Sequence, residues 1–555
     1  MIAYLRRIAS LVGQESWKRY KRSFLFAAVS ALFETVSIAA ILPLMAIVLS
    51  EQGGQQIGSF HLTPMTGLTG LAMLYVLGLG LRALSIQYTA RVNLQEGYAF
   101  GARLFRAILL QPLTWHNVNH SSKLRAAVLS EAQDFISFVT IPLGRLLAQI
   151  CLVISVAAVL VAVRPLETLV FAAALAAAYL GVFFLLRKPL KINAEKQIDC
   201  HAARHKLSTE ALSAIREVRL SRLEDTFASD FRDASMMLAE VAAKKVLFTD
   251  FPKLVLEFIL FFSLMAVIVS MASVDGFMVS GGLGELLLFG AAMLKLFPSG
   301  HLVFANLTTL KSGQALMDKL EQLSDSFLHD ECSGTVPEMC KELRVDDVSY
   351  TYPGRATSSV SNISFSAKPG DRIAITGPSG SGKSTVVDLI AGLITPDTGK
   401  ICVDGKTLQA GQLVSWQKQI RYCPQVPSLF DLGIAENIAV GCEYDDKAIR
   451  ESVAMTLLEN LQDALGPDYL TISIGELGRK LSGGQIQRIN LARMLYKTAP
   501  VYILDEPTNN LDLKTAQQIM GKVFCEKPNA IFIVVTHEQW LADMCDKVVT
   551  LQASS

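Results

Sequence analysis

Long apolar runs separated by charged stretches dominate the first 320 or so residues of the chain. Six runs are candidate membrane helices, at roughly 23–49, 65–89, 138–162, 166–186, 254–273 and 282–304. A helix that crosses a bilayer needs about 20 mainly apolar residues, so the pattern predicts six transmembrane helices. The alternative is a soluble protein with buried helices, which would need several apolar runs of this length. A cleaved signal peptide is not expected, because the first run is too long for one.

The segments between the apolar runs predict the orientation of the chain. Lys and Arg gather before the first run, after the second and after the fourth, whereas residues 51–63 and 274–285 contain neither. Basic residues favour the cytoplasmic side. We therefore expect a multi-pass protein of the inner (plasma) membrane with both termini in the cytoplasm. The opening segment, with Leu5, Ile8 and Val12 on one side, predicts a helix along the membrane surface or a plain soluble helix.

Beyond residue 340 the apolar runs become short, and a glycine-rich loop stands between a predicted strand at 372–376 and a predicted helix at 386–390. In such a loop the glycines let backbone N–H groups turn toward phosphate oxygens, and the helix presents its positive end. Lys383 is expected to reach the β- and γ-phosphates of ATP, and Ser384 to ligate Mg²⁺. The alternative is a glycine-rich turn without a ligand. The loop fills the pattern G-x-x-x-x-G-K-[ST] with Gly377, Pro378, Ser379, Gly380, Ser381, Gly382, Lys383, Ser384 and Thr385.

Two acids follow the apolar strand predicted at 501–504 and supply what ATP hydrolysis needs. We expect Asp505 to hold Mg²⁺ through water and Glu506 to polarise the attacking water.

Length and composition limit the classes of protein to which the chain can belong. At 555 residues the chain is too long for one compact domain, and its net charge of +1 gives no general attraction to nucleic acid. Its nine cysteines include no C-x-x-C pair, so neither a disulfide framework nor a zinc site is expected.

Together with the run Leu481, Ser482, Gly483, Gly484 and Gln485, these motifs resemble the ATP-binding cassette (ABC) family. The resemblance implies roles for four further residues. Tyr352 is similar to the aromatic residue that stacks on adenine, although Tyr350 is a neighbouring candidate. Gln425 is similar to the glutamine that senses Mg²⁺ and the membrane domain, His537 to the histidine that contacts the γ-phosphate, and Asp512 to a dimer-contact aspartate. Asn509 and Asn510 depart from the commoner Ser-Ala pair, which leaves cross-subunit signalling open.

The resemblance also implies a fold and a partner. We expect an α-helical six-span transmembrane domain at 1–323, a linker at 324–340, and an α/β P-loop NTPase (ABC nucleotide-binding) domain at 341–555. The signature loop at Ser482 exposes donors at a helix start and is expected to close on a γ-phosphate held by a second cassette. One copy of each domain makes the chain a half-transporter. A homodimer is the simplest assembly, and a heterodimer stays open.

Two long polar stretches, at 90–137 and 187–250, are similar to the intracellular helix extensions of ABC exporters. Their tips, at 115–125 and 214–225, would be the coupling helices that rest on the cassettes, although solvated linkers are the alternative. Glu476 matches an acidic loop of these exporters or is a surface acid. Short segments at 215–220, 251–257 and 295–299 resemble the membrane half of bacterial lipid-linked oligosaccharide flippases.

Charges inside the apolar runs predict the cargo. Arg82, Lys253 and Lys295 lie within or beside predicted spans, where a charge costs about 2.5–3.5 kcal/mol and should face a cavity or a partner. A cationic cavity suits an amphipathic anionic lipid or lipid-linked saccharide. Alternatively, Arg82 and Arg145 extend to the cytoplasmic surface, and Glu257 neutralises Lys253.

The sequence is compatible with three other functions. One is an exporter of peptides or drugs with the same fold. A non-transport ABC ATPase that acts on ribosomes or DNA repair is opposed by the six predicted spans. An ATP-gated channel is opposed by the intact Glu506, which predicts turnover of ATP.

Overall fold

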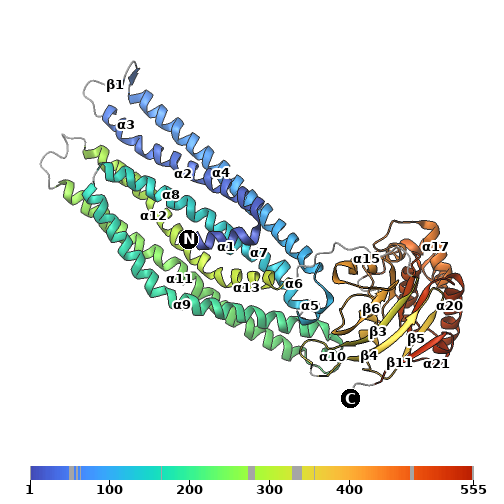
Figure 1. Ribbon diagram of the computed structural model, residues 1–555. Coiled ribbons are helices and arrows are strands. Elements are labelled where there is room, and N and C mark those ends of the chain that lie inside the picture. The colour runs from blue at the N-terminus through green and yellow to red at the C-terminus, as the bar shows by residue number, and fades with distance from the viewer. Residues whose placement is uncertain are drawn as a thin grey trace. The chain divides into compact units, whose positions relative to one another are not determined.

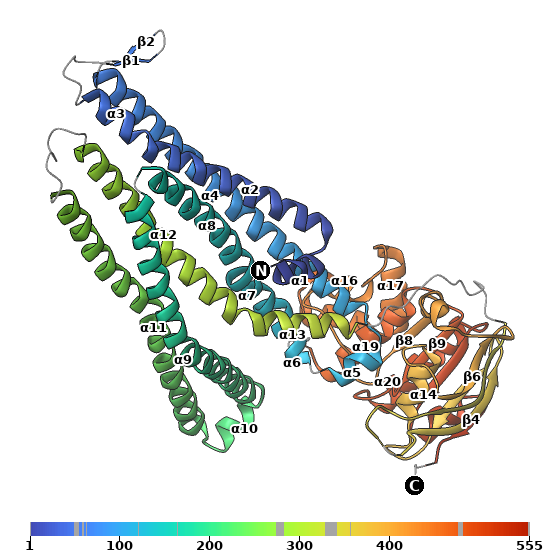
Figure 2. The same ribbon diagram turned by 60° about the vertical axis from the view of Figure 1, so that its left-hand side comes forward.

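The computed structural model describes residues 2–48, 55–57, 60–62, 64–119, 121–163, 165–272, 282–327, 341–355, 357–475 and 481–552. The chain divides into two compact units (Figures 1 and 2). Unit 1 comprises residues 1–110 and 121–327, and unit 2 comprises residues 111–120 and 328–555. Most of the predicted linker, and Glu476 with it, lie outside the described residues.

Long helices build unit 1, and the predicted spans coincide with them. Several of these helices continue beyond the apolar run into the predicted extensions, so one helix serves both parts. The helices are α1 (Ile2–Val12), α2 (Gln14–Ala39), α3 (Ile41–Val48), α4 (Pro64–Leu109), α6 (Ser121–Ala126), α7 (Ala132–Phe135), α8 (Ile141–Val163), α9 (Pro165–Ser213), α10 (Ile215–Leu220), α11 (Glu224–Ala272), α12 (Gly282–Ser312) and α13 (Gln314–Asp325). A short hairpin of β1 (Gln55–Ile57) and β2 (Phe60–Leu62) lies in the segment expected to be an external loop.

Within the described residues, three helical stretches are long and apolar enough to cross a membrane: Gln14–Leu44, Met65–Leu109 and Lys123–Val163. They carry the first three predicted spans. The other three predicted spans fall on α9, α11 and α12.

Small residues let the helices of unit 1 approach closely. A Cβ at Gly97 of α4 would come 2.1 Å from Ile136, and one at Gly313 would come 3.0 Å from the carbonyl oxygen of Phe138. Apolar side chains of α2, α8 and α12 form a buried cluster that includes Ile38 and Leu296. Both glycines lie outside the predicted spans, so this close packing belongs to the helical parts beyond the apolar runs.

Unit 2 contains two sheets. Their strands are β3 (Leu343–Tyr350), β4 (Val360–Ala367), β5 (Arg372–Thr376), β6 (Thr398–Val403), β7 (Lys406–Thr407), β8 (Ile420–Cys423), β9 (Val501–Asp505), β10 (Ile531–Val535) and β11 (Lys547–Thr550). The parallel sheet has the order β11-β5-β10-β9-β8, and the antiparallel sheet has the order β4-β3-β6-β7. Strands β9 and β10 are buried at every position, and all their residues are apolar or aromatic except Asp505 at the end of β9.

The helices of unit 2 complete the α/β fold. They are α5 (Leu113–Val118), α14 (Lys383–Ile390), α15 (Leu413–Gln417), α16 (Ile434–Ile438), α17 (Asp446–Met455), α18 (Leu461–Leu465), α19 (Gly483–Leu495), α20 (Leu513–Glu526) and α21 (Gln539–Asp543). Helix α5 falls in the segment predicted as the first coupling helix, and Leu113 packs against the core of unit 2. The predicted second coupling segment contains α10, which stays in unit 1.

Candidate nucleotide site

The predicted site residues follow the carboxyl ends of four neighbouring parallel strands. The phosphate loop follows β5, His537 follows β10, Asp505 ends β9, and Gln425 follows β8. Ligands of open α/β sheets bind at this edge, because the loops that leave the strand ends converge there. The parallel order therefore brings together side chains that are more than 150 positions apart in the sequence.

The phosphate loop is shaped for a close ligand. Gly382 has φ of 88°, and a Cβ there would come 2.2 Å from the carbonyl oxygen of Ser359. The Lys383 ammonium donates to the carbonyl oxygens of Gly377, at 2.9 Å, and Pro378, at 3.0 Å. The hydroxyl of Ser381 is buried and has no hydrogen-bond partner among the described residues. An unpartnered buried hydroxyl beside an ammonium and a helix start fits a bound phosphate.

The metal ligands expected from the sequence lie near each other. The Ser384 hydroxyl donates to Asp505 at 3.5 Å. Burial and the neighbouring Glu506 raise the pKa of Asp505, although the Ser384 hydroxyl lowers it. Burial and Asp505 raise the pKa of Asp388, on α14, to about 6. A divalent cation would relieve this crowding of buried carboxyl groups, so the residues fit Mg²⁺.

Glu506 is held by three polar neighbours. Its carboxylate accepts from Gln425 at 2.9 Å and from Asn509 at 2.7 Å, and His537 Nδ1 lies 3.4 Å away. Burial acts to raise the pKa of Glu506, but the hydrogen bonds from Asn509 and Gln425 and the nearby His537 lower it overall. The φ of Glu506 is 47°, a left-handed conformation that is costly for this residue type. The carboxylate is thus kept ionised and fixed in place, as a general base requires.

The contact of Asn509 with the carboxylate was not predicted from the sequence, in which Asn509 stands out only as a departure from the commoner residue in the family. The side chain of Asn509 is long enough to return to a residue three positions earlier, and the turn after β9 directs it there. Spacing alone gave no signal for this contact.

Replacing Asn509 with alanine should raise the pKa of Glu506, because a donor to the carboxylate is lost. A base works only above its pKa, so the acidic limb of the pH profile of ATP hydrolysis should move to higher pH. We also expect kcat to fall by about tenfold or more, since a hydrogen bond to a charged group contributes about 1.5–3 kcal/mol. Asn509→Asp keeps the shape of the side chain but places a second negative charge beside Glu506. The acidic limb of its pH profile should therefore move to still higher pH. Identical acidic limbs for all three proteins would contradict the role of Asn509.

The two candidate tyrosines occupy different environments. Tyr350 is buried in the core of unit 2, whereas Tyr352 is half-buried at its edge. The Tyr352 hydroxyl accepts from Thr385 of the phosphate loop at 3.4 Å, and the guanidinium of Arg355 lies 5.7 Å from its ring centre. Only Tyr352 of the pair therefore has a ring edge next to the phosphate loop and surface available for stacking.

The signature loop lies at the start of α19. The Ser482 hydroxyl accepts from the backbone N–H of Gln485, whose side chain accepts from the backbone N–H of Ser482. A Cβ at Gly484 would come 2.8 Å from the carbonyl oxygen of Asn510, so this position requires glycine. Asp512 begins α20 and accepts from the backbone N–H of Thr515 at 3.0 Å. Asp512 therefore caps helix α20, a contact that was not predicted from the sequence.

Two family models match the chain. The model for the ABC transporter transmembrane region matches residues 23–293, and the ABC transporter model matches residues 360–509. The curated relatives include an ATP-dependent lipid A-core flippase of Cupriavidus metallidurans, which is 28% identical over 465 residues, covering 81% of this chain and 76% of that protein. A protein of the same name from Thiobacillus denitrificans is 31% identical over 347 residues, covering 62% of this chain and 59% of that protein.

A solved structure agrees with the architecture. A bacterial Atm1-family ABC exporter with ATP bound has a TM-score of 0.79 and 20% sequence identity, with coverage of 96% of this chain and 93% of that chain. At this identity the likeness shows the fold only. The exporter fold spans both units, and the two family models account for the membrane helices and for the ATP site. The chain therefore belongs to the ABC transporters, with a helical transmembrane region followed by an ABC nucleotide-binding domain that binds and hydrolyses ATP.

Proposed function

We propose that this chain is one half of an ATP-driven flippase for an amphipathic anionic lipid or lipid-linked saccharide. The observation that carries the proposal is a set of charged side chains inside the membrane helices. The carboxylate of Glu34 on α2 pairs with Arg82 on α4 and Lys295 on α12, and Lys295 lines a cavity. Ionisable groups at such depth mark substrate pathways in transporters. The names of the relatives, ATP-dependent lipid A-core flippase, point to the same class of cargo.

The chemistry of the ATP site follows from its geometry. The phosphate loop and Lys383 would hold the β- and γ-phosphates, and Glu506 would take a proton from the attacking water. Gln425 and Asn509 would keep the Glu506 carboxylate aimed at that water, and His537 would contact the γ-phosphate. Mg²⁺, held by Ser384 and by Asp505 and Gln425 through water, would supply charge neutralisation on the phosphate oxygens.

A second subunit is part of this proposal. The phosphate loop already has a helix start, that of α14, for its own nucleotide. The N–H and O–H donors at the start of α19 are therefore available for a phosphate held by another cassette. We propose a homodimer in which Ser482, Gly483 and Gly484 of one cassette close on the nucleotide of the other. Binding of ATP would bring the cassettes together, and hydrolysis at Glu506 would release them. The distribution of Lys and Arg supports both termini in the cytoplasm and insertion in the inner membrane.

The three cations predicted to meet substrate are in different surroundings. Arg82 and Lys295 share Glu34, whereas Lys253 lies exposed on α11 and is not among the residues that line the cavity. Arg145, on α8, is exposed as well. We therefore propose Lys295, which lines the cavity, as the principal charge for the head group, Arg82 as a charge that acts through its pairing with Glu34, and Lys253 as a secondary contact.

Lys295→Ala tests the substrate class. In liposomes the wild-type ATPase should be stimulated by anionic glycolipids, and the variant should lose most of that stimulation while keeping its basal rate, because the cassette is unchanged. A panel of lipid-linked sugars, phospholipids and peptides would be compared, with Glu506→Gln as the blank. A flat response to every lipid with stimulation by a peptide would instead identify a peptide exporter of the same fold.

A further inference from the structure

The lysine that lines the membrane cavity has a counterion within the protein. Lys295 Nζ on α12 lies 3.6 Å from Oε1 of Glu34 on α2, and both side chains line a cavity of about 480 Å³. Most of the other described residues that line it are apolar. A lone ammonium would be destabilised in such surroundings, and the carboxylate relieves this cost while the cavity is empty. An anionic group that enters must therefore compete with Glu34 for Lys295.

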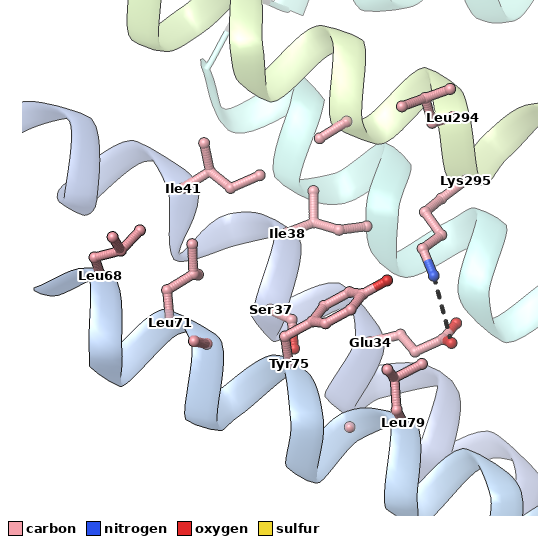
Figure 3. Close-up of a pocket in the computed structure, with 13 residues that line it drawn as sticks. Glu34, Ser37, Ile38, Ile41, Leu68, Leu71, Tyr75, Leu79, Leu294 and Lys295 are labelled. Atoms are coloured by element: carbon pink, nitrogen blue, oxygen red, sulfur yellow. Dashed lines mark ion pairs between the residues drawn. The ribbon is translucent and has the colours of Figure 1, made fainter.

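This competition takes place at one end of the cavity. Glu34 and Lys295 lie toward that end, and Ile41 and Leu68 lie toward the other (Figure 3). The ring of Tyr75 crosses between them, with Lys295 Nζ 5.9 Å from its centre. A cavity with one charged end and one apolar end fits a ligand with a charged head and an apolar chain. The head group of such a ligand would lie where Glu34 meets Lys295.

Glu34 has a second partner, which allows the lysine to leave. Its Oε1 lies 2.6 Å from Arg82 Nη1 on α4, a closer contact than the one with Lys295. The Glu34 side chain is only 8% exposed, and a buried carboxylate that loses its partner is strongly destabilised. Arg82 remains as that partner when Lys295 turns to a ligand. The lysine can therefore exchange Glu34 for a head group without leaving a buried charge unpaired.

The pair of Glu34 and Arg82 presents its negative member to the cavity. Glu34 is one of the described residues that line the cavity, and Arg82 is not. A head group bound to Lys295 therefore stands closer to the carboxylate than to the guanidinium. Because Coulomb energy falls with distance, the pair repels an anion in the cavity although its own net charge is zero. The repulsion depends on where the two charges lie and acts on anions of any charge.

We propose that Glu34 is a built-in competitor of the anionic head group. It pairs with Lys295 in the empty cavity, weakens binding of the head group, and pairs with the lysine again when the head group leaves. The inference rests on the proposed transport of an anionic lipid and concerns the regulation of that same site. Glu34 acts through Lys295 and is a positioning residue in this account. A site that binds its cargo only moderately is also able to release it.

The test measures binding of a photoactivatable phosphatidylglycerol to the full-length protein in phosphatidylcholine vesicles, at rising mole fractions of the probe. Binding in the cavity is the part of the crosslinking that Lys295→Ala abolishes. Glu34→Gln keeps the shape of the side chain and removes its charge, so both the competition and the repulsion are lost. The half-saturating mole fraction for cavity binding should therefore fall by about tenfold or more.

A double variant covers the case in which Glu34→Gln does not fold because Arg82 has lost its partner. Glu34→Gln with Arg82→Gln removes the whole pair and leaves the site with the net charge of +1 that the three side chains have together. Lys295 then faces the cavity without a competitor. Binding should still be about three- to fivefold tighter than in the wild type. Binding equal to that of the wild type would show that only the sum of charges matters, and would overturn the inference.

Glu96 on α4 provides a matched control. It is likewise buried, pairs with Arg19 at 2.6 Å, and is not among the described residues that line the cavity. Glu96→Gln should therefore leave cavity binding within about twofold of the wild type, since its charge acts elsewhere.

The outcomes separate the inference from the proposed function. Unchanged or weaker binding in folded Glu34→Gln, or an equal gain in Glu96→Gln, overturns the competition while lipid binding at Lys295 stands. Crosslinking that Lys295→Ala does not reduce, in the wild type and in the Glu34 variants alike, overturns the proposed lipid site as well. Tighter binding confined to the two Glu34 variants supports the inference.

Discussion

Glu506→Gln is expected to reduce ATP hydrolysis by about 10²–10⁴-fold, the usual contribution of a positioned general base. The amide has the shape of the carboxylate but cannot accept a proton from water. The contacts to Gln425 and Asn509 are made by an oxygen that the amide keeps, so the site should retain its geometry. The steady-state rate in purified protein measures the loss.

Nucleotide binding provides the control for this variant. The phosphate loop and Tyr352 are unchanged, so the affinity for ATP should stay within about threefold of the wild type. A Glu506→Gln protein that binds ATP normally and still hydrolyses it at more than about a tenth of the wild-type rate would contradict the assignment of the base.

Gly382→Ala is expected to weaken ATP binding by about 100-fold or more, equivalent to about 2.7 kcal/mol. A Cβ at this position would come 2.2 Å from the carbonyl oxygen of Ser359, and the φ of 88° is itself unfavourable for alanine. The loop must rearrange to relieve both effects, and it then loses the directions of the N–H groups that face the phosphates. Titration with a fluorescent ATP analogue measures the change.

Gly380→Ala separates the two causes. Gly380 also has a positive φ, of 81°, but apart from its chain neighbours no described residue lies within 4 Å of the Cβ that alanine would add. This variant should lose binding only by the cost of the backbone conformation, about 1 kcal/mol, or roughly fivefold. Equal losses in the two variants would show that close approach to Ser359 is not what makes Gly382 necessary.

The sequence predicted the elements around the ATP site well, because each is marked by a local pattern. The strand predicted at 372–376 is β5, the strand predicted at 501–504 is β9, and the helix predicted after the phosphate loop is α14. The membrane helices could be predicted equally well, since the length of an apolar run decides whether it can cross a bilayer. The apolar pattern did not show how far these helices continue, since α4 and α11 extend past their apolar runs into the extensions.

Contacts between residues that are far apart in the chain could not be predicted from local sequence patterns. Arg82 and Lys295 were identified as costly charges, but nothing in the pattern indicated that Glu34 pairs with both of them. The cationic cavity expected from the sequence is thus partly neutralised. The predicted domain boundaries put residues 111–120 in the membrane domain, whereas by their contacts they belong to unit 2; only the resemblance that made the tip at 115–125 a coupling helix had indicated such contacts. Pairing and packing of this kind depend on the tertiary fold, which no local spacing encodes.

ATP-dependent flipping of an anionic lipid tests the central claim most directly. The purified protein would be placed in vesicles with a trace of a head-group-labelled anionic lipid, and its movement between leaflets followed by quenching from outside. We predict that movement requires hydrolysable ATP, falls to background in Glu506→Gln and is strongly reduced in Lys295→Ala. Movement that continues without ATP, or at the wild-type rate in Glu506→Gln, would contradict the account and indicate a passive pathway.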